Sequence, residues 1–382
     1  MRILHTGDLH LDSAFCSFGA KDAERHREYG RDLLRRIFNC AREESCELIL
    51  ISGDLFDSGF VSGETGELFC RLVEENDICV AVAPGNHDPY STNSFYAKIQ
   101  SRLGERLILF TSAELQMFEI EEKKVRLFGY GFTSAAITES PLADMEVPED
   151  DGYLRILCAH ADIFSPVSRY APLTLEQLEI FNFDYAALGH VHNKWNESEL
   201  DGRVRYCGFG EGRSFDELGE GGVWIVDLSK EDIACERKIL SQRAFYIENV
   251  NVTEDDDIST LRAKICAVAN EKEHSQEIYL RIILEGSADE ALVSDICAQT
   301  ENMADECGVE FLEIQDETMP VLDGEYLEKD MTLRGALYRT LRPKLLSSDP
   351  VERRKAIKAL RIGLAAIDGK NIFSAVGKGG QR

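Results

Sequence analysis

Five short stretches of the chain carry aspartate, histidine and asparagine where apolar, strand-like runs end. Carboxylate, amide and imidazole groups are the donors that divalent cations bind in proteins. In chain order the stretches are Asp8-Leu9-His10, Gly53-Asp54-Leu55-Phe56-Asp57, Gly85-Asn86-His87-Asp88, His160 and Gly189-His190-Val191-His192. Because loops at strand ends lie at the surface, such side chains can converge there without burying unsatisfied backbone groups. Together they provide seven groups suited to hold two divalent metals, and one further histidine.

Two cations held close together suit the hydrolysis of a phosphodiester, whose anionic oxygens repel nucleophiles. At a separation of roughly 3.5–4 Å they lower the pKa of a shared water towards about 7 and neutralise the phosphate oxygens. One carboxylate must bridge such close cations. We expect Asp54 to be the bridge, because it follows a buried strand and Gly53 lets the chain turn sharply there.

The spacing of the other residues indicates how they would be shared. Asp8 and His10 lie two residues apart, so on an extended segment both would face one metal. His190 and His192 have the same spacing, although a turn there could send one to each metal. Taken singly, each stretch has an ordinary explanation as a core residue or a solvated turn. Five of the eight histidines fall in these stretches, which favours a joint function.

The series D-x-H, G-D-x-x-D, G-N-H-D, H and G-H-x-H resembles the calcineurin-like metallophosphoesterase superfamily. The finer resemblance is to its SbcD/YhaO branch, bacterial relatives of the nuclease that processes broken DNA ends in eukaryotes. Its details are His5-Thr6-Gly7-Asp8-Leu9-His10-Leu11-Asp12, Gly53-Asp54-Leu55-Phe56-Asp57, Tyr206-Cys207-Gly208, Glu211-Gly212-Arg213 and Phe215-Asp216-Glu217. The chain departs from the pattern at Phe209-Gly210 and at Ala161-Asp162, and neither departure removes a ligand.

The resemblance implies a role for each matching residue. One metal would be held by Asp8, His10, Asp54 and His192. The other would be held by Asp54, Asn86, His160 and His190. His87 would not bind a metal but would face the phosphate and assist the leaving oxygen, with Asp88 orienting it. Family members favour manganese, so two Mn²⁺ ions are the expected cofactors.

The order of elements predicts an α/β (α+β) fold. Strands and helices alternate at first and later segments are more purely β, which fits a four-layer metallophosphoesterase β-sandwich flanked by helices. We expect this nuclease domain to cover residues 1–240. A β-α-β-α-β order then predicts a small α+β capping domain over 241–320. The remaining residues, 321–382, form a basic tail with a C-terminal helical hairpin.

Charge is distributed unevenly along the chain. The net charge is −27, which argues against a protein that coats nucleic acid unaided. Residues 331–382 nevertheless hold twelve Lys or Arg and only three Asp or Glu. A basic arm on an acidic body indicates a docking segment or a local phosphate contact, and a solvated helical tail is the alternative.

The cysteines and the hydropathy of the chain indicate in which compartment we expect the protein. Eleven cysteines occur without a C-x-x-C pair. Several, such as Cys79, Cys158 and Cys266, lie in apolar patterns, so we expect buried free thiols in a reducing cytoplasm. The sequence contains no apolar run of about 18 residues, so it predicts no membrane-spanning helix.

The leading hypothesis is a manganese-dependent DNA exonuclease or endonuclease in DNA repair. The resemblance implies a partner, a coiled-coil SbcC/YhaN-like ATPase bound through the C-terminal helices, and a possible homodimer. Two alternatives stay open: a phosphodiesterase for small molecules or cyclic nucleotides, and a non-catalytic scaffold for the ATPase.

Overall fold

The computed structural model describes residues 1–15, 20–143, 152–272 and 276–369. They form two compact units, Met1–Ala244 and Phe245–Arg382. Strand β12 (Ile233–Val252) runs through the division between the units. The three-part division expected at residues 240 and 320 therefore stays a prediction. None of the helices in the described ranges is both long and apolar enough to cross a membrane.

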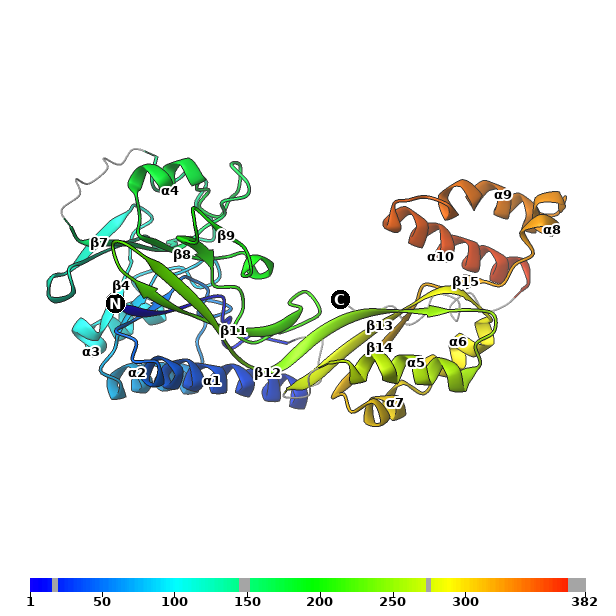
Figure 1. Cartoon of the computed structure of the whole chain (residues 1–382), viewed down its shortest axis with the longest axis horizontal. Coiled ribbons are helices and arrows are strands. Elements are labelled where there is room, and N and C mark those ends of the chain that lie inside the picture. Colours follow the sequence, from blue (N-terminus) through cyan, green and yellow to red (C-terminus); the bar gives the residue numbers. More distant parts are fainter. Residues whose placement is uncertain (16–19, 144–151, 273–275, 370–382) are drawn as a thin grey trace. The chain divides into compact units, whose positions relative to one another are not determined.

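The first unit contains two sheets (Figure 1). In the first sheet, parallel strands β1 to β4 lie side by side, β11 joins β1 in antiparallel pairing, and β12 flanks β11. Its strands other than β12 are β1 (Arg2–Thr6), β2 (Leu48–Ile51), β3 (Cys79–Val82), β4 (Leu107–Leu109) and β11 (Gly219–Leu228). In the second sheet, β6, β7, β8 and β10 run parallel, and β5 and β9 pair antiparallel at the two edges. Its strands are β5 (Gln116–Ile120), β6 (Val125–Gly129), β7 (Leu154–His160), β8 (Tyr185–Gly189), β9 (Ser198–Glu199) and β10 (Val204–Tyr206).

The side-chain alternation of the strands divides the core into layers. Ile3, Leu48 and Leu50 point between the two sheets and pack with buried residues of β6, β7 and β8. Their neighbours Leu4 and Ile49 point to the other face and pack under helices. Those helices are α1 (Ala20–Glu43), α2 (Gly63–Glu75) and α3 (Phe95–Leu103), while α4 (Leu175–Phe181) covers the far face of the second sheet. This arrangement confirms the predicted four-layer α/β fold for the part of the unit that the structure describes.

The second unit is a small α+β layer. Strands β12, β13 (Glu277–Ala288) and β14 (Phe311–Asp316) form its sheet, and β15 (Met319–Pro320) pairs with the end of β13. Helices α5 (Ile258–Asn270), α6 (Glu290–Cys297) and α7 (Thr300–Cys307) supply its core. The single helix expected between the last two strands is thus two helices. The Thr300 hydroxyl donates to the Cys297 carbonyl where the first of them ends.

Within the described residues, three further helices follow in the second unit, α8 (Gly324–Lys329), α9 (Leu333–Leu345) and α10 (Pro350–Ile367). The Asp349 side chain caps α10 by accepting from the Val351 amide. Apolar residues of α9 and α10, among them Leu345 and Leu360, pack together, so the expected hairpin is present.

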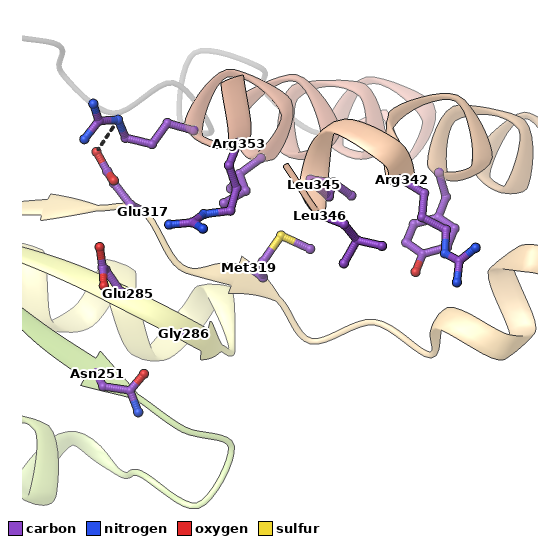
Figure 2. Close-up of a pocket in the computed structure, with 12 residues that line it drawn as sticks. Asn251, Glu285, Gly286, Glu317, Met319, Arg342, Leu345, Leu346 and Arg353 are labelled. Carbon is purple, nitrogen blue, oxygen red and sulfur yellow. Dashed lines mark ion pairs between the residues drawn. The ribbon is translucent and has the colours of Figure 1, made fainter. Parts of the chain in front are cut away.

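A cavity of about 500 Å³ lies in the second unit between the hairpin and the strands beneath it (Figure 2). Met319, Leu345 and Leu346 contribute apolar side chains to its lining, and Arg354 and Glu317 contribute an ion pair. The cavity is lined by no histidine or aspartate. All seven ligands predicted from the sequence, from Asp8 to His192, lie in the first unit.

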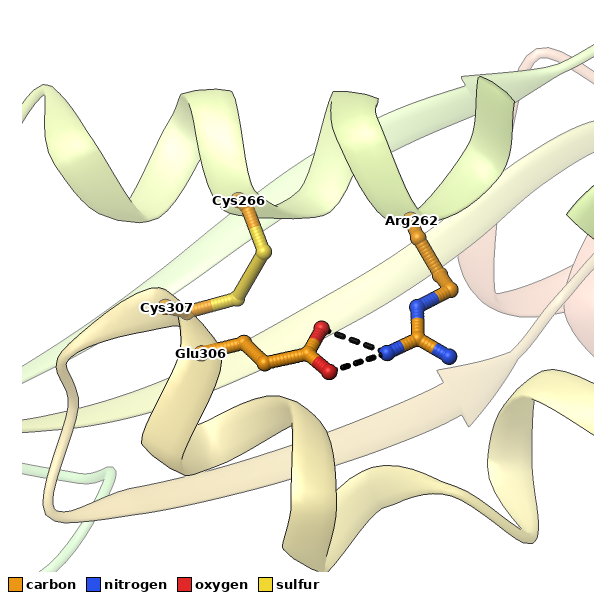
Figure 3. Close-up of a disulfide and its surroundings, with 4 residues drawn as sticks. All are labelled: Arg262, Cys266, Glu306 and Cys307. Atoms are coloured by element: carbon orange, nitrogen blue, oxygen red, sulfur yellow. Dashed lines mark hydrogen bonds and ion pairs between the residues drawn. A yellow bond between two sulfur atoms is a disulfide. The ribbon is translucent and has the colours of Figure 1, made fainter. Parts of the chain in front are cut away.

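One cysteine prediction is wrong. Cys266, expected to be a free thiol, forms a disulfide with Cys307 that joins α5 to α7 (Figure 3). The two residues are 41 positions apart, and only the packing of the two helices brings their Cα atoms to 4.8 Å. Cys79 and Cys158 are free, as expected, and Cys158 is buried.

Candidate metal centre

The candidate ligands lie where parallel strands end. Asp8 follows β1, Asp54 follows β2, and Asn86 follows β3. In the second sheet His160 is the last residue of β7, and His190 directly follows β8. Carboxyl ends of parallel strands share one edge of a sheet, so each sheet brings its own set of ligands to a common rim.

Hydrogen bonds between the first two loops bring Asp8 and Asp54 together. The amides of Asp8, His10 and Leu11 donate to the carbonyls of Gly53, Asp54 and Leu55 at 3.0, 2.9 and 2.9 Å. The backbone is left-handed at Asp8 (φ 49°), His10 (φ 44°) and Asp54 (φ 47°). The extended segment expected at Asp8 and His10 is therefore wrong, although both side chains still face the cluster. Left-handed backbone at a residue other than glycine costs about 1–3 kcal/mol, and such strain collects at functional sites.

Three overlapping groups of donors converge at the rim, and in each group the donor atoms lie within 4.8 Å of one another. Asp54 belongs to two of them: its Oδ2 is 3.7 Å from His10 Nε2 and 3.4 Å from His160 Nε2. A carboxylate between two imidazoles from different sheets is placed as a bridge would be. The groups are Asp8, His10 and His192; Asp8, Asp54 and His160; and His10, Asp54 and His87.

Asn86 and His190 extend the cluster on the side of His160. Asn86 Oδ1 lies 3.0 Å from His160 Nε2, and the rings of His160 and His190 are 5.1 Å apart. The His190 amide donates to Asp8 Oδ2 at 2.9 Å. The structure thus brings together all seven predicted ligands. Which ion each would bind stays a prediction.

One unpaired atom supports a metal at this place. His10 Nε2 is buried and has no hydrogen-bond partner within the described ranges. A buried polar atom without a partner is costly, and a cation in front of it removes that cost. The mixed carboxylate, amide and imidazole donors fit Mn²⁺, iron or zinc. The residues therefore fit a pair of divalent ions.

Burial and neighbouring charges shift the pKa values of these groups in different directions. Burial lowers the pKa of His10 and His160, and lowers that of His190 to about 4, which keeps the three imidazoles neutral. Burial also raises the pKa of Asp54, and the charge of Asp8 adds to this effect. Burial would lower the pKa of His192, but Asp8 and then Glu217 raise it to about 10.

Glycine at two positions allows the loops to approach this closely. A Cβ at Gly85 would lie 2.1 Å from Asp54 Oδ1 and 2.6 Å from the Asp54 amide nitrogen. A Cβ at Gly53, which has φ +96°, would lie 2.3 Å from His160 Nδ1. Any larger residue at either position would displace a candidate ligand.

His87 stands at the open side of the cluster. Its Nδ1 lies 3.1 Å from the Asp57 carbonyl oxygen and 3.7 Å from Asp57 Oδ1. Asp88 was expected to orient this ring, but its carboxylate accepts hydrogen bonds from the amides of Gly85 and Phe56 and from the Tyr96 hydroxyl. Asp88 therefore holds the loop that carries His87, and Asp57 contacts the ring. Burial raises the pKa of Asp88 to about 6.

The sequence motifs contained two further site residues to which we assigned no role. Asp57 Oδ1 lies 3.0 Å from His10 Nδ1, and Glu217 Oε1 lies 2.8 Å from His192 Nδ1. Such carboxylate–histidine pairs are typical of metal sites. Their signals were the second aspartate of G-D-x-x-D and the glutamate of Phe215-Asp216-Glu217.

A family model for calcineurin-like phosphoesterases matches residues 1–194, and this match includes every predicted ligand. The chain belongs to the calcineurin-like phosphoesterase family. The family resemblance found in the motifs is confirmed, and with it a metal-dependent hydrolase of phosphoesters.

The relatives with which the chain shares sequence include YhaO and SbcD proteins, as the motifs predict. It is 26% identical over 308 residues to the uncharacterized metallophosphoesterase YhaO of Bacillus subtilis, covering 77% of this chain and 74% of that one. It is 23% identical over 355 residues to the SbcD component of the nuclease SbcCD of Escherichia coli, covering 82% and 84%. It is 24% identical over 274 residues to the DNA double-strand break repair protein Mre11 of Haloferax volcanii, covering 69% and 58%.

We expect Gly85→Ala to weaken metal binding by about tenfold or more, because the added methyl group displaces the Asp54 carboxylate. Titration of the chelator-treated protein with Mn²⁺ measures this. Gly59→Ala is the matched control, since nothing lies within 4 Å of a Cβ there. Equal affinity in the two variants would contradict the close approach.

We also expect metal affinity to rise with pH. With a pKa of about 10, His192 is protonated in the metal-free chain at neutral pH, and a metal must displace that proton. Between pH 6 and 8 the affinity of the ion bound by His192 should increase about tenfold per unit. Calorimetry in two buffers of different ionisation enthalpy would count the released proton. A flat pH profile would contradict the prediction.

Proposed function

We propose that this protein is a two-metal, manganese-dependent DNA nuclease that acts in DNA repair. The observation that carries the proposal is the convergence of the seven ligands around Asp54, with His87 beside them. The names of two relatives, a component of a nuclease and a double-strand break repair protein, favour DNA as the substrate.

The residues divide the work of phosphodiester cleavage. Asp8, His10, Asp54 and His192 would hold one ion, and Asp54, Asn86, His160 and His190 the other. A pair of divalent ions supplies an activated water and charge compensation for the phosphate. The His87 amide donates to Asp54 Oδ1 at 2.9 Å, which fixes this carboxylate between the residues that would hold the two ions.

His87 is the residue that would act on the leaving oxygen. The ring donates through Nδ1 to the Asp57 carbonyl, so Nε2 is directed away from that loop. The ring is more exposed than those of His10, His160 and His192, which suits contact with a phosphate. A protonated His87 can give its proton to the departing alkoxide.

We expect His87→Ala to retain both metal ions and to lose about 10²–10⁴-fold in hydrolysis. End-labelled single- and double-stranded DNA in the presence of Mn²⁺, with bis(p-nitrophenyl) phosphate as a small substrate, provides the assay. Hydrolysis of cyclic nucleotides or the small substrate, but not of DNA, would favour the small-phosphodiester alternative. A metal-loaded wild-type protein without any hydrolysis would favour the scaffold.

We propose that a coiled-coil ATPase docks on the hairpin of α9 and α10. The relative SbcD is named as one subunit of the nuclease SbcCD, and this name favours a second protein component for this chain too. The hairpin displays apolar side chains to solvent: Leu333 is 75% exposed and Leu346 74%. Basic residues such as Arg353 and Arg354 lie on the same helices. An apolar and basic helical surface suits an acidic, amphipathic partner helix.

We expect Leu346→Glu to abolish co-purification with the ATPase and to leave hydrolysis of bis(p-nitrophenyl) phosphate unchanged, because it places a charge on the docking surface. Met117→Glu on β5, at a side chain 49% exposed, is the control and should co-purify normally. Normal co-purification of Leu346→Glu, and of a chain that lacks residues 331–382, would refute docking through the hairpin.

A further inference from the structure

A single guanidinium connects the two carboxylates that contact His10 and His192. Arg213 Nη1 lies 3.4 Å from Asp57 Oδ1, and Arg213 Nη2 lies 2.6 Å from Glu217 Oε1. These are the same two oxygen atoms that face the Nδ1 atoms of His10 and His192. The result is a continuous set of contacts, His10–Asp57–Arg213–Glu217–His192, which we call the Arg213 bridge.

The Arg213 bridge determines which nitrogen of each ring faces the metals. An ionised carboxylate only accepts hydrogen bonds, so Nδ1 of His10 and of His192 must carry the proton. The opposite nitrogens then face the acidic ligands: His10 Nε2 is 3.7 Å from Asp54 Oδ2, and His192 Nε2 is 3.6 Å from Asp8 Oδ1. Each ring is thereby presented with the nitrogen that a metal needs.

Arginine suits this position for a geometric reason. Its planar fork carries five N–H donors, so it can contact two carboxylates at once, whereas the ammonium of lysine is a point charge. The positive charge also offsets two carboxylates added beside Asp8 and Asp54, which already share a buried site. The Glu217 carboxylate is buried and lies against both His192 and Arg213, at 2.8 and 2.6 Å.

The segment that carries Arg213 is itself fixed to the sheet. The Glu211 carboxylate is buried and accepts hydrogen bonds from the amides of Gln242 and Arg243 on β12, at 3.0 and 3.0 Å. Arg213 in turn closes the loop to Glu217, because its own amide donates to Glu217 Oε2 at 2.8 Å. The family resemblance includes Glu211-Gly212-Arg213 but implies no role for this segment. In the structure Glu211 anchors the segment to β12, and the Arg213 side chain extends to Asp57 and Glu217.

The other half of the cluster is supported differently. His160 Nδ1 lies 3.1 Å from the backbone carbonyl of Ser52, so a neutral group of the strand end orients that ring. His190 packs against Tyr170, with ring centres 4.6 Å apart. Loss of Arg213 would therefore disturb the supports of His10 and His192 and leave those of His160 and His190 in place.

We propose that Arg213 is the positioning residue for one of the two metals. It holds His10 and His192 in the tautomer and orientation that bind the ion shared with Asp8 and Asp54, and it has no such role for the ion near Asn86 and His160. The inference rests on the two-metal site of the proposed function but not on DNA as its substrate.

Titration of the full-length, chelator-treated protein with Mn²⁺ tests the proposal. Arg213→Gln should bind one ion about 10–100-fold more weakly than the wild type, and the other ion with wild-type affinity. The affinity of Arg213→Lys for the weakened ion should lie between those of the wild type and Arg213→Gln, because lysine keeps the positive charge but lacks the planar guanidinium. Arg126→Gln is the matched control: its side chain is 23% exposed, against 24% for Arg213, and it also pairs with a glutamate.

Two further measurements separate positioning from a purely structural role. Metal-free Arg213→Gln should unfold in a single transition well above the titration temperature, so that loss of the ion cannot be due to unfolding. The double variant Arg213→Gln with Glu217→Gln should lose less affinity than the two single variants added together, because both act through His192. Equal weakening of both ions, unchanged binding of both, or unfolding of Arg213→Gln at the titration temperature would overturn the proposal. The titration uses no DNA, so failure of the wild type to cleave DNA would leave it standing.

Discussion

The site depends on holding two buried carboxylates, Asp8 and Asp54, next to each other. Like charges in a medium of low dielectric repel strongly, so this placement is unfavourable unless positive charge or hydrogen-bond donors offset it. Backbone amides supply part of the compensation, from His190 to Asp8 and from His87 to Asp54. A pair of divalent cations would supply the rest, and the carboxylate, amide and imidazole donors at this rim fit such ions.

The sandwich makes this placement possible through the direction of its strands. Parallel strands β1, β2 and β3 end at one edge of the first sheet, and β7 and β8 end at one edge of the second. The side chains between the sheets, such as Ile3 and Leu50, fix the two edges against each other. Left-handed backbone at Asp8, His10 and Asp54 then turns the ligands inwards, at a cost that the packed layers must sustain.

Charge around the cluster is organised asymmetrically. Nδ1 of the candidate ligands His10 and His192 contacts a carboxylate, while Nδ1 of His160 contacts a backbone carbonyl. Ionic supports respond to the charge state of their neighbours, and a backbone support does not. Two ions bound a few ångströms apart can thus differ in affinity although their ligands are of similar types.

The sequence by itself determined the candidate ligands, the layered α/β fold and the family. Rare residue combinations such as Gly-Asn-His-Asp can be recognised directly in the sequence, and the alternation of strands and helices follows from local periodicity. Tertiary structure alone decided the contacts that join distant segments. Asp57 and Arg213 lie 156 positions apart, so their contact appears only after both loops fold onto the rim. The same holds for Cys266 with Cys307 and for the contact of Asp88 with the Phe56 amide, 32 positions away. Local pattern encodes what each segment is, and long-range packing determines what each side chain touches.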